Sequence, residues 1–142
     1  MTTSPPQRTG GPPVQGPRLS YPELKAMAIE FLKSHRSGIF ATGKRDGSPQ
    51  QSYLGYTFNG TDVIIETGDS AAKVKNARKR PSVSLAVNEG PTCVVVYGNA
   101  RLLQGAEAEA YLGKPAGNGS QPGEPTLIVF TPETWRWARL QG

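Results

Sequence analysis

Apolar residues spaced three and four apart mark the first ordered element of the chain. They form one helical face, made of Leu24, Met27, Ala28, Phe31 and Leu32. Just before this face, Ser20 and Glu23 have the spacing of a capping box, and Pro22 suits the first helical turn. The pattern predicts a helix that begins after Ser20 and ends at Gly38.

The rest of the chain shows the two-residue alternation that is typical of β-strands. The predicted strands cover residues 39–43, 50–58, 62–67, 83–87, 93–103, 126–131 and 134–140. Asp46-Gly47 and Asn59-Gly60 favour tight hairpin turns. Gly98 interrupts the run over residues 93–103, which predicts a β-bulge. Hairpin-linked strands around a small core favour a barrel, because closure removes exposed sheet edges.

Two short segments between strands have helical character. Residues 71–80 are predicted to form a helix that is capped by Gly68-Asp69-Ser70 and stopped by Pro81. Residues 106–112 favour one or two helical turns, and residues 114–124 then favour a flexible connection. The predicted fold is mainly β (α+β): about six antiparallel strands, an N-terminal helix and a short helix inserted mid-sheet.

Residues 1–18 differ from everything that follows. They are rich in proline and glycine and contain almost no apolar side chains. Such a segment buries too little surface to offset its ordering entropy, so we expect a disordered tail. The remaining residues, 19–142, are expected to form one domain.

The composition excludes several classes of protein. The chain is 36% hydrophobic and has no apolar run of the roughly 20 residues that a membrane span needs. Its start lacks the apolar stretch of a secretory signal, so a cytoplasmic location is expected. A single cysteine, Cys93, and a single histidine, His35, offer no metal-ligand spacing, so no metal site is expected.

The net charge of +5 favours an anionic partner. The basic residues concentrate on the predicted helix over residues 71–80 rather than along a strand groove, and aromatic residues make up only 8% of the chain. Both features argue against nucleic-acid binding. A membrane surface and a phosphorylated small molecule stay open as anionic partners, because bulk charge alone does not decide between them.

The clearest chemical signal lies where a strand, a glycine-containing turn and a helix start follow one another, over residues 65–81. Free N–H groups and the helix dipole favour an anion at such a helix start. Thr67 and Ser70 add hydroxyl donors, and Lys73 and Asn76 share one helix face near that end. The arrangement favours a phosphate site.

Two other interpretations of this segment stay open from the residues alone. Asp69 is itself a good capping residue, and its carboxylate is able to occupy the helix start and repel a phosphate. The basic run from Lys73 to Arg80 also has the pattern of a solvated charged face.

Five pieces of the sequence carry a family resemblance. They are IFATGKRDGSPQQSYLGYTFNG, DVIIET, SAAKVKNARKRPSVSLAV, CVVVYGNARLL and TPETWRWARL. Together they resemble the flavin- and deazaflavin-binding split β-barrel family related to pyridoxamine 5′-phosphate oxidase, over most of the chain after the tail. The resemblance implies a split β-barrel homodimer with its cofactor bound across the interface.

The resemblance also implies which residues meet the cofactor. Phosphate contacts fall on the strand, turn and helix start near Lys73, and the strand from Gln51 to Tyr56 lies along the ring system. Glu66 sits where the next strand passes the ring, and Cys93 reaches the cofactor from the long strand. The expected cofactor-binding residues are Gln51, Ser52, Tyr53, Glu66, Thr67, Ser70 (or Ala71), Lys73, Asn76 and Cys93.

Two residues depart from the pattern of the pyridoxamine phosphate oxidases. Those enzymes have arginines where this chain has Gln51 and Ala72, and losing two cations weakens a compact FMN phosphate site. The Ser-Ala-Ala-Lys form followed by a basic helix looks more like the deazaflavin-using branch. The cofactor of that branch carries a longer acidic tail, which a spread-out basic helix is able to follow.

No pair of nucleophile and base suggests a hydrolase, whereas in hydride transfer the cofactor supplies the chemistry. The resemblance therefore implies an oxidoreductase that uses coenzyme F420, with hydride moving to or from a small unsaturated or carbonyl-conjugated molecule. The alternatives are an FMN-dependent pyridoxamine phosphate oxidase-like enzyme, or a non-catalytic flavin or deazaflavin carrier or sensor. No catalytic side chain is identified.

Overall fold

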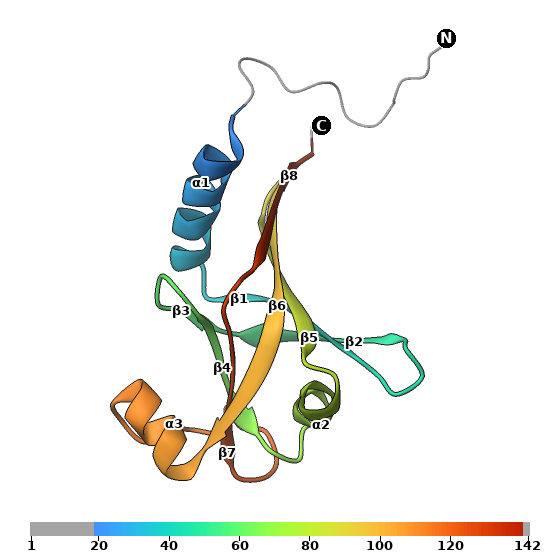
Figure 1. Cartoon of the computed structure of the whole chain (residues 1–142), viewed down its shortest axis with the longest axis vertical. Coiled ribbons are helices and arrows are strands. Elements are labelled where there is room, and N and C mark those ends of the chain that lie inside the picture. The colour runs from blue at the N-terminus through green and yellow to red at the C-terminus, as the bar shows by residue number, and fades with distance from the viewer. Residues whose placement is uncertain (1–18, 141–142) are drawn as a thin grey trace.

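The computed structural model describes residues 19–140, which form three helices and eight strands (Figure 1). The elements are α1 (Tyr21–Lys33), β1 (Ser37–Gly43), β2 (Pro49–Gly55), β3 (Thr57–Phe58), β4 (Val63–Gly68), α2 (Ala72–Lys79), β5 (Ser82–Glu89), β6 (Thr92–Gln104), α3 (Gly105–Leu112), β7 (Pro125–Phe130) and β8 (Thr134–Arg139). The predicted tail over residues 1–18 lies outside the described residues.

Two classes of feature are absent from residues 19–140. No helix there combines the length and the apolar character that crossing a membrane requires. No cluster of His, Cys, Asp or Glu side chains in the same range is suited to holding a metal ion.

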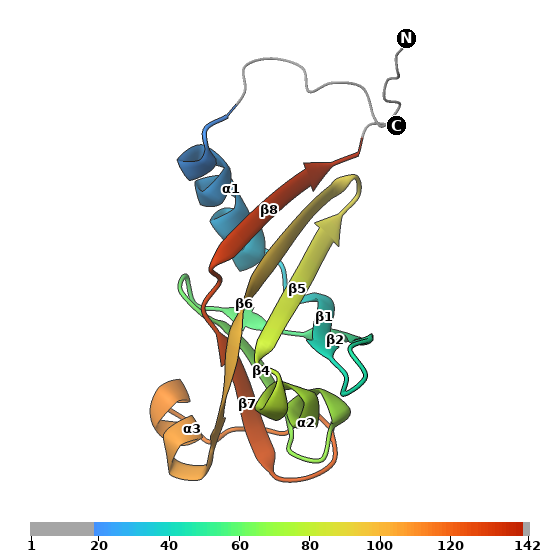
Figure 2. The same ribbon diagram turned by 45° about the vertical axis from the view of Figure 1, so that its right-hand side comes forward.

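The strands form one antiparallel sheet built around β6. The order is β2-β1-β5-β6-β7-β4-β3, and β8 also pairs with β6. The long β6 pairs first with β8, through Thr92–Tyr97, and then with β7, through Ala100–Gln104. The two views in Figures 1 and 2 show the sheet curling around this strand. The fold is the predicted mainly β split barrel, with eight strands rather than about six.

Several local predictions are confirmed. Gly47 and Gly60 occupy the two predicted hairpin turns with positive φ values of 90° and 97°. Asp46 tightens the first turn, because its carboxylate accepts hydrogen bonds from the N–H and hydroxyl of Ser48. The helical turns expected over residues 106–112 form α3.

Tyr56 divides the predicted strand over residues 50–58 into β2 and β3. Its backbone N–H donates to the Arg36 carbonyl at 2.9 Å, and its hydroxyl donates to the Leu32 carbonyl at 2.7 Å. Burial raises the pKa of Tyr56 to about 12, so the hydroxyl keeps its proton. These bonds tie the end of β2 to the end of α1.

The β-bulge predicted at Gly98 is wrong. The β5–β6 register runs without interruption through Val83–Gly98 and Ser82–Asn99. A Cβ at Gly98 would lie 2.6 Å from the Thr131 carbonyl oxygen and 2.9 Å from the Phe130 ring. Glycine is required here because the chain that follows β7 passes directly over β6.

Helix α1 has the predicted capping box, in which the Ser20 hydroxyl and the Glu23 carboxylate each accept the other residue's backbone N–H. The helix ends at Lys33, however, before the predicted end at Gly38. The Ser34 hydroxyl donates to the Phe31 carbonyl, and His35 Nδ1 lies 2.7 Å from the same oxygen. These side chains contact the Phe31 carbonyl oxygen, which would have to accept a backbone N–H if the helix continued.

The two faces of the sheet differ in burial. Phe40, Leu85 and Val96 are fully buried on the inner face, where α1 and α2 close the core. The other face, which we call the outer face, carries half-buried or exposed residues. They include Ile39, Tyr53, Ala86, Val95 and Tyr97.

Candidate functional site

A cavity of about 640 Å³ lies where β2, β4 and the start of α2 meet. Residues 52–57 and 64–66 form its strand walls, and Lys73 lines it from α2. Arg36 and two residues of the loop between α3 and β7, Gly119 and Gln121, complete the lining. In Figure 2, α2 lies beside the lower part of the sheet, at the end of β4.

Lys73 is the most unusual residue of this cavity. It is only 8% exposed, and among residues 19–140 no carboxylate lies within ion-pair distance of its ammonium and no hydrogen bond holds it. Burial lowers the pKa of Lys73, because the charged form loses solvation. A charge that loses part of its solvation without gaining a partner is costly, so the site favours an anionic ligand.

The N-terminus of α2 adds positive electrostatic potential next to Lys73. The N-cap residue is Ala71, and no side chain accepts a hydrogen bond from the first helical turn. The predicted cap by Gly68-Asp69-Ser70 is therefore wrong. The Asp69 carboxylate instead accepts the N–H of Glu124 at 3.0 Å, and the Ser70 N–H donates to the Pro122 carbonyl.

These contacts have a consequence for Asp69. Its side chain lines a different hollow, together with Gln104, Glu109 and Glu124. The interpretation in which Asp69 fills the helix start is thus contradicted, because the returning loop offers its carboxylate a backbone N–H elsewhere. The first turn of α2 is left with a free positive end.

Thr67 lies at the end of β4, two residues before Asp69. The residue is fully buried, and among the described residues its hydroxyl oxygen has no hydrogen-bond partner. A buried hydroxyl without a partner costs about 1–3 kcal/mol. Thr67 does not line the cavity, but its strand leads directly into the turn before α2.

Three more predicted residues do line the cavity: Ser52, Tyr53 and Glu66. The Ser52 hydroxyl accepts a hydrogen bond from Gln50, and the hydroxyl of the exposed Tyr53 side chain lies 3.0 Å from that of Ser37. The Glu66 carboxylate accepts the N–H of Gly117 at 2.9 Å. The structure thus brings Ser52, Tyr53, Glu66 and Lys73 together.

The remaining predicted residues lie outside this lining. Gln51 is exposed on β2, on the outer face of the sheet, and Ser70 is turned toward the loop before β7. Asn76 donates to the Thr42 hydroxyl at 3.1 Å and accepts from Arg80, so it ties α2 to β1.

Cys93 lies apart from the cavity as well. It is half-buried on β6, in register with Asn88 of β5 and Ala138 of β8. Burial raises the pKa of the Cys93 thiol, which keeps it protonated.

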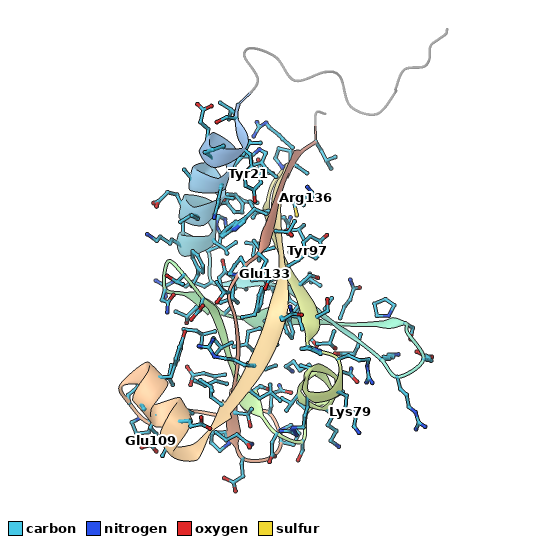
Figure 3. The ribbon with its side chains drawn as sticks, viewed as in Figure 1. Tyr21, Lys79, Tyr97, Glu109, Glu133 and Arg136 are labelled. Atoms are coloured by element: carbon cyan, nitrogen blue, oxygen red, sulfur yellow. The ribbon has the colours of Figure 1, made fainter. Side chains whose placement is uncertain are left out.

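A second hollow of about 480 Å³ lies between α2 and the β1–β2 hairpin. It is lined by Arg45, Lys75, Asn76, Lys79 and Arg80. Arg80 is fixed in place, because its Nε donates to the Gly43 carbonyl at 2.8 Å. Lys79 projects from the solvent side of α2 (Figure 3). Among the described residues none of the four cations has a carboxylate partner.

Sequence reasoning missed Arg36, Gly119 and Gln121. Arg36 follows the predicted helix as an ordinary polar residue, and residues 114–124 have the composition of any surface connection. The place of Gly119 and Gln121 at the cavity depends on how the chain returns toward β4 after α3. No local signal in the sequence reports that path.

The comparisons with known proteins agree with this architecture. The family model for pyridoxamine 5′-phosphate oxidase matches residues 24–137. An F420 reductase structure is similar with a TM-score of 0.61 and 19% identity, covering 75% of this chain and 94% of the other. General stress protein 26 from Bacillus anthracis has a TM-score of 0.63 and 15% identity, with 81% and 94% covered.

A candidate pyridoxamine 5′-phosphate oxidase from Listeria innocua is similar to the same degree. Its TM-score is 0.61 at 21% identity, and the match covers 80% of this chain and 94% of the other. At these identities the structures establish the shared fold. The family match spans most of the chain, from α1 to β8, and so carries the assignment further: the chain belongs to the pyridoxamine 5′-phosphate oxidase family.

Proposed function

We propose that this protein is a small oxidoreductase that holds a phosphate-bearing flavin or deazaflavin in the cavity between β2, β4 and α2. The observation that carries the proposal is the largely buried Lys73 side chain, which lines the cavity and whose ammonium has no counter-ion among the described residues. The uncapped start of α2 adds backbone N–H groups beside it. An anionic ligand group would satisfy both.

The residues present fit a cofactor of this kind. Lys73, which lines the cavity from α2, would hold its phosphate. Ser52 and Tyr53 offer hydroxyl groups along the wall formed by β2. When bound, such a cofactor supplies hydride chemistry, so the protein's own task is to bind, orient and exclude water.

We further propose that the cofactor is the deazaflavin coenzyme F420, with FMN as the alternative. Gln51 and Ala72 occupy positions where arginine would strengthen a compact phosphate site. The second, basic hollow of Arg45, Lys75, Lys79 and Arg80 continues the positive surface along α2. A cofactor with an extended acidic tail would use these four cations, whereas FMN would not reach beyond the first cavity.

The proposed reaction moves a hydride between the cofactor and a small unsaturated or carbonyl-conjugated molecule. In the reducing direction, the hydride adds to one end of the conjugated system and a solvent proton completes the reduction at the other. The cavity is open enough to admit a small planar substrate beside the ring. No side chain of the lining is assigned an acid or base role.

We also propose that the protein acts as a homodimer through the outer face of the sheet. Tyr53, Ile39, Ala86, Val95 and Arg136 follow one another in register across β2, β1, β5, β6 and β8. Tyr97 and Arg136 project from β6 and β8 (Figure 3). An exposed row of this kind, apolar with a charged rim, is typical of a protein interface.

A titration tests the cofactor assignment. The purified full chain is titrated separately with FMN and with coenzyme F420, and the fluorescence of Trp135 and Trp137 is followed. We expect F420 to bind more tightly. A preference of tenfold or more for FMN contradicts the deazaflavin assignment, and binding of neither contradicts the proposed function.

A turnover assay separates an enzyme from a carrier or sensor. The protein is supplied with reduced cofactor and a panel of enones and quinones, and cofactor oxidation is followed by absorbance. Consumption above the protein-free blank supports the enzyme. Tight binding without turnover across the panel supports a carrier.

A further inference from the structure

The segment between α3 and β7, residues 113–124, contains four glycines and is called the glycine loop below. Its last residues are bonded firmly to the turn between β4 and α2. The Asp69 N–H donates to the Glu124 carbonyl and the Ser70 N–H to the Pro122 carbonyl, while the Glu124 N–H donates to the Asp69 carboxylate. This end of the loop is therefore fixed beside the start of α2.

The middle of the glycine loop is held differently. Among the described residues, the only hydrogen bond that joins residues 114–121 to the sheet runs from the Gly117 N–H to Glu66 Oε1, at 2.9 Å. The other bonds of this stretch are internal, from Ser120 and Gln121 to Asn118. The Glu66 carboxylate thus supplies the one hydrogen bond to the sheet that these described residues make, beside the packing of Ala116 against the cluster that contains Ile64 and Leu127.

The packing of the loop against β4 leaves no room for side chains. Gly119 has a φ of 60°, and a Cβ there would lie 2.6 Å from the Glu66 carbonyl oxygen. A Cβ at Gly68 would collide with the Pro122 carbonyl. The loop and β4 therefore meet backbone to backbone, which places the loop as a wall of the cavity.

The glycine loop differs in charge from the part of the cavity that Lys73 lines. Gly119 and Gln121 line the same cavity as Lys73. Residues 115–122, Pro-Ala-Gly-Asn-Gly-Ser-Gln-Pro, include amide and hydroxyl side chains but no charged one. The loop offers neutral hydrogen-bonding groups next to a cationic site.

We propose that the glycine loop is a specificity-determining wall, in which Gln121 contacts the uncharged, hydroxyl-bearing part of the ligand next to its phosphate. Glu66 acts as the positioning residue, because it holds the loop in place through Gly117. This inference rests on the proposed function, since the ligand is the phosphate-bearing cofactor proposed above. It also gives Glu66 a role that needs no contact with the ring.

Hydrogen exchange in the full-length, ligand-free protein tests the positioning role. We compare wild type with Glu66→Ala, which removes the acceptor, and with Glu66→Gln, which retains an acceptor oxygen but no charge. Loss of a hydrogen bond to a charged acceptor predicts at least about tenfold faster exchange of the peptide over residues 113–124 in Glu66→Ala. Glu66→Gln should remain within about threefold of wild type. Unchanged exchange in Glu66→Ala, or equal loosening in both variants, overturns the positioning role.

Ligand binding tests the specificity role. Gln121→Ala should weaken the binding of both FMN and F420 by about threefold to tenfold, the effect of one neutral hydrogen bond. The same variant should bind inorganic phosphate as wild type does, since phosphate lacks the hydroxylated part. Lys114→Ala is the matched control, because it lies in the same loop but outside the cavity lining. Unchanged affinity for both cofactors in Gln121→Ala overturns the specificity role.

Gly119→Ala gives an independent perturbation of the loop that leaves Glu66 intact. Its Cβ would push the loop from β4, so it should reproduce the faster exchange and the weaker cofactor binding. Wild-type exchange and wild-type affinity in this variant contradict the proposal. Failure of the proposed function would look different, because the wild-type protein itself would then bind neither cofactor, while the exchange comparison would still report on the loop.

Discussion

Thr67 of β4 and Thr126 of β7 are paired across the sheet and equally buried, yet only Thr126 has hydrogen-bond partners for its hydroxyl. The Thr126 hydroxyl donates to the Glu124 carbonyl at 3.0 Å and accepts from Gln104 at 2.8 Å. The Thr67 hydroxyl has no hydrogen-bond partner among residues 19–140. The difference leaves Thr67 with a buried, unpartnered hydroxyl close to the turn that leads into α2.

Replacing each threonine by valine should therefore give opposite results. Thr67→Val removes an unsatisfied hydroxyl and should raise the unfolding free energy of the ligand-free protein by about 1 kcal/mol. Thr126→Val breaks two hydrogen bonds and should lower it by about 1–3 kcal/mol. Denaturant unfolding of both variants measures the contrast. Equal destabilisation by the two changes would contradict this account.

Lys73→Ala should weaken the binding of FMN or F420 by about tenfold or more, since a charge-assisted hydrogen bond contributes about 1.5–3 kcal/mol. Arg78→Ala is the matched control, because Arg78 is exposed on the same helix and lines neither hollow. Fluorescence titration measures both. Lys73→Met should in addition raise the thermal stability of the ligand-free protein, because it removes an unpaired charge whose partial desolvation lowers the pKa of Lys73. Unchanged affinity in Lys73→Ala would remove α2 from the proposed site.

Asp62 should make the stability of the fold sensitive to acid. Burial raises the pKa of its carboxyl, but hydrogen bonds from Thr131 and Tyr111 and the nearby Arg101 guanidinium outweigh burial, so the net pKa lies below the ordinary value of 3.8. A lowered folded-state pKa gives stability that is present above pH 3.8 and is lost as the pH falls through the folded pKa.

The variant Asp62→Asn should accordingly be less stable than wild type at neutral pH, by about 1–3 kcal/mol. The difference in unfolding free energy between wild type and Asp62→Asn should become smaller as the pH falls below about 4, where the wild-type carboxylate becomes protonated. Denaturant unfolding across this range measures it, with Glu109→Gln, at an exposed position of α3 (Figure 3), as the control. If the difference in unfolding free energy did not change with pH, the charged Asp62 carboxylate would be excluded as its cause.

Gly98→Ala should destabilise the fold by about 1–3 kcal/mol, because its Cβ would collide with the Thr131 carbonyl and the Phe130 ring. Gly43→Ala, also in a strand, meets its nearest neighbour at 3.9 Å and should have a small effect. Thermal unfolding of the two variants tests whether the chain after β7 packs tightly against β6 at Gly98. Similar melting temperatures would indicate that the chain after β7 is free to move aside.

The proposed dimer interface leads to a prediction about assembly. Ile39→Arg places a charge in the middle of the row on the outer face, and the protein should then sediment as a monomer. Met27→Arg is the control, since Met27 is an exposed apolar residue of α1 away from that face. Analytical ultracentrifugation measures both variants and wild type. A monomeric wild type would refute the interface directly.

The sequence determined the elements of this protein because their signals are local. The capping box of Ser20 and Glu23, the turns at Gly47 and Gly60 and the alternation around Leu85 each depend on neighbours within a few residues. The strand, turn and helix start near Lys73 were visible for the same reason. Together with the family resemblance, these signals were sufficient to predict a split β-barrel and the corner at which an anion is expected.

The tertiary structure decided what those elements meet. Asp69 looked like a helix cap, but the returning glycine loop offers it the Glu124 N–H, so α2 begins without one. The sequence predicted a bulge at Gly98, but in the structure this glycine lets Phe130 and Thr131, some thirty residues further along the chain, pack against β6. Gln121 reaches the cavity of Lys73 for the same reason. Contacts between segments far apart in the chain depend on the path of the whole backbone, and no short stretch of sequence encodes that path.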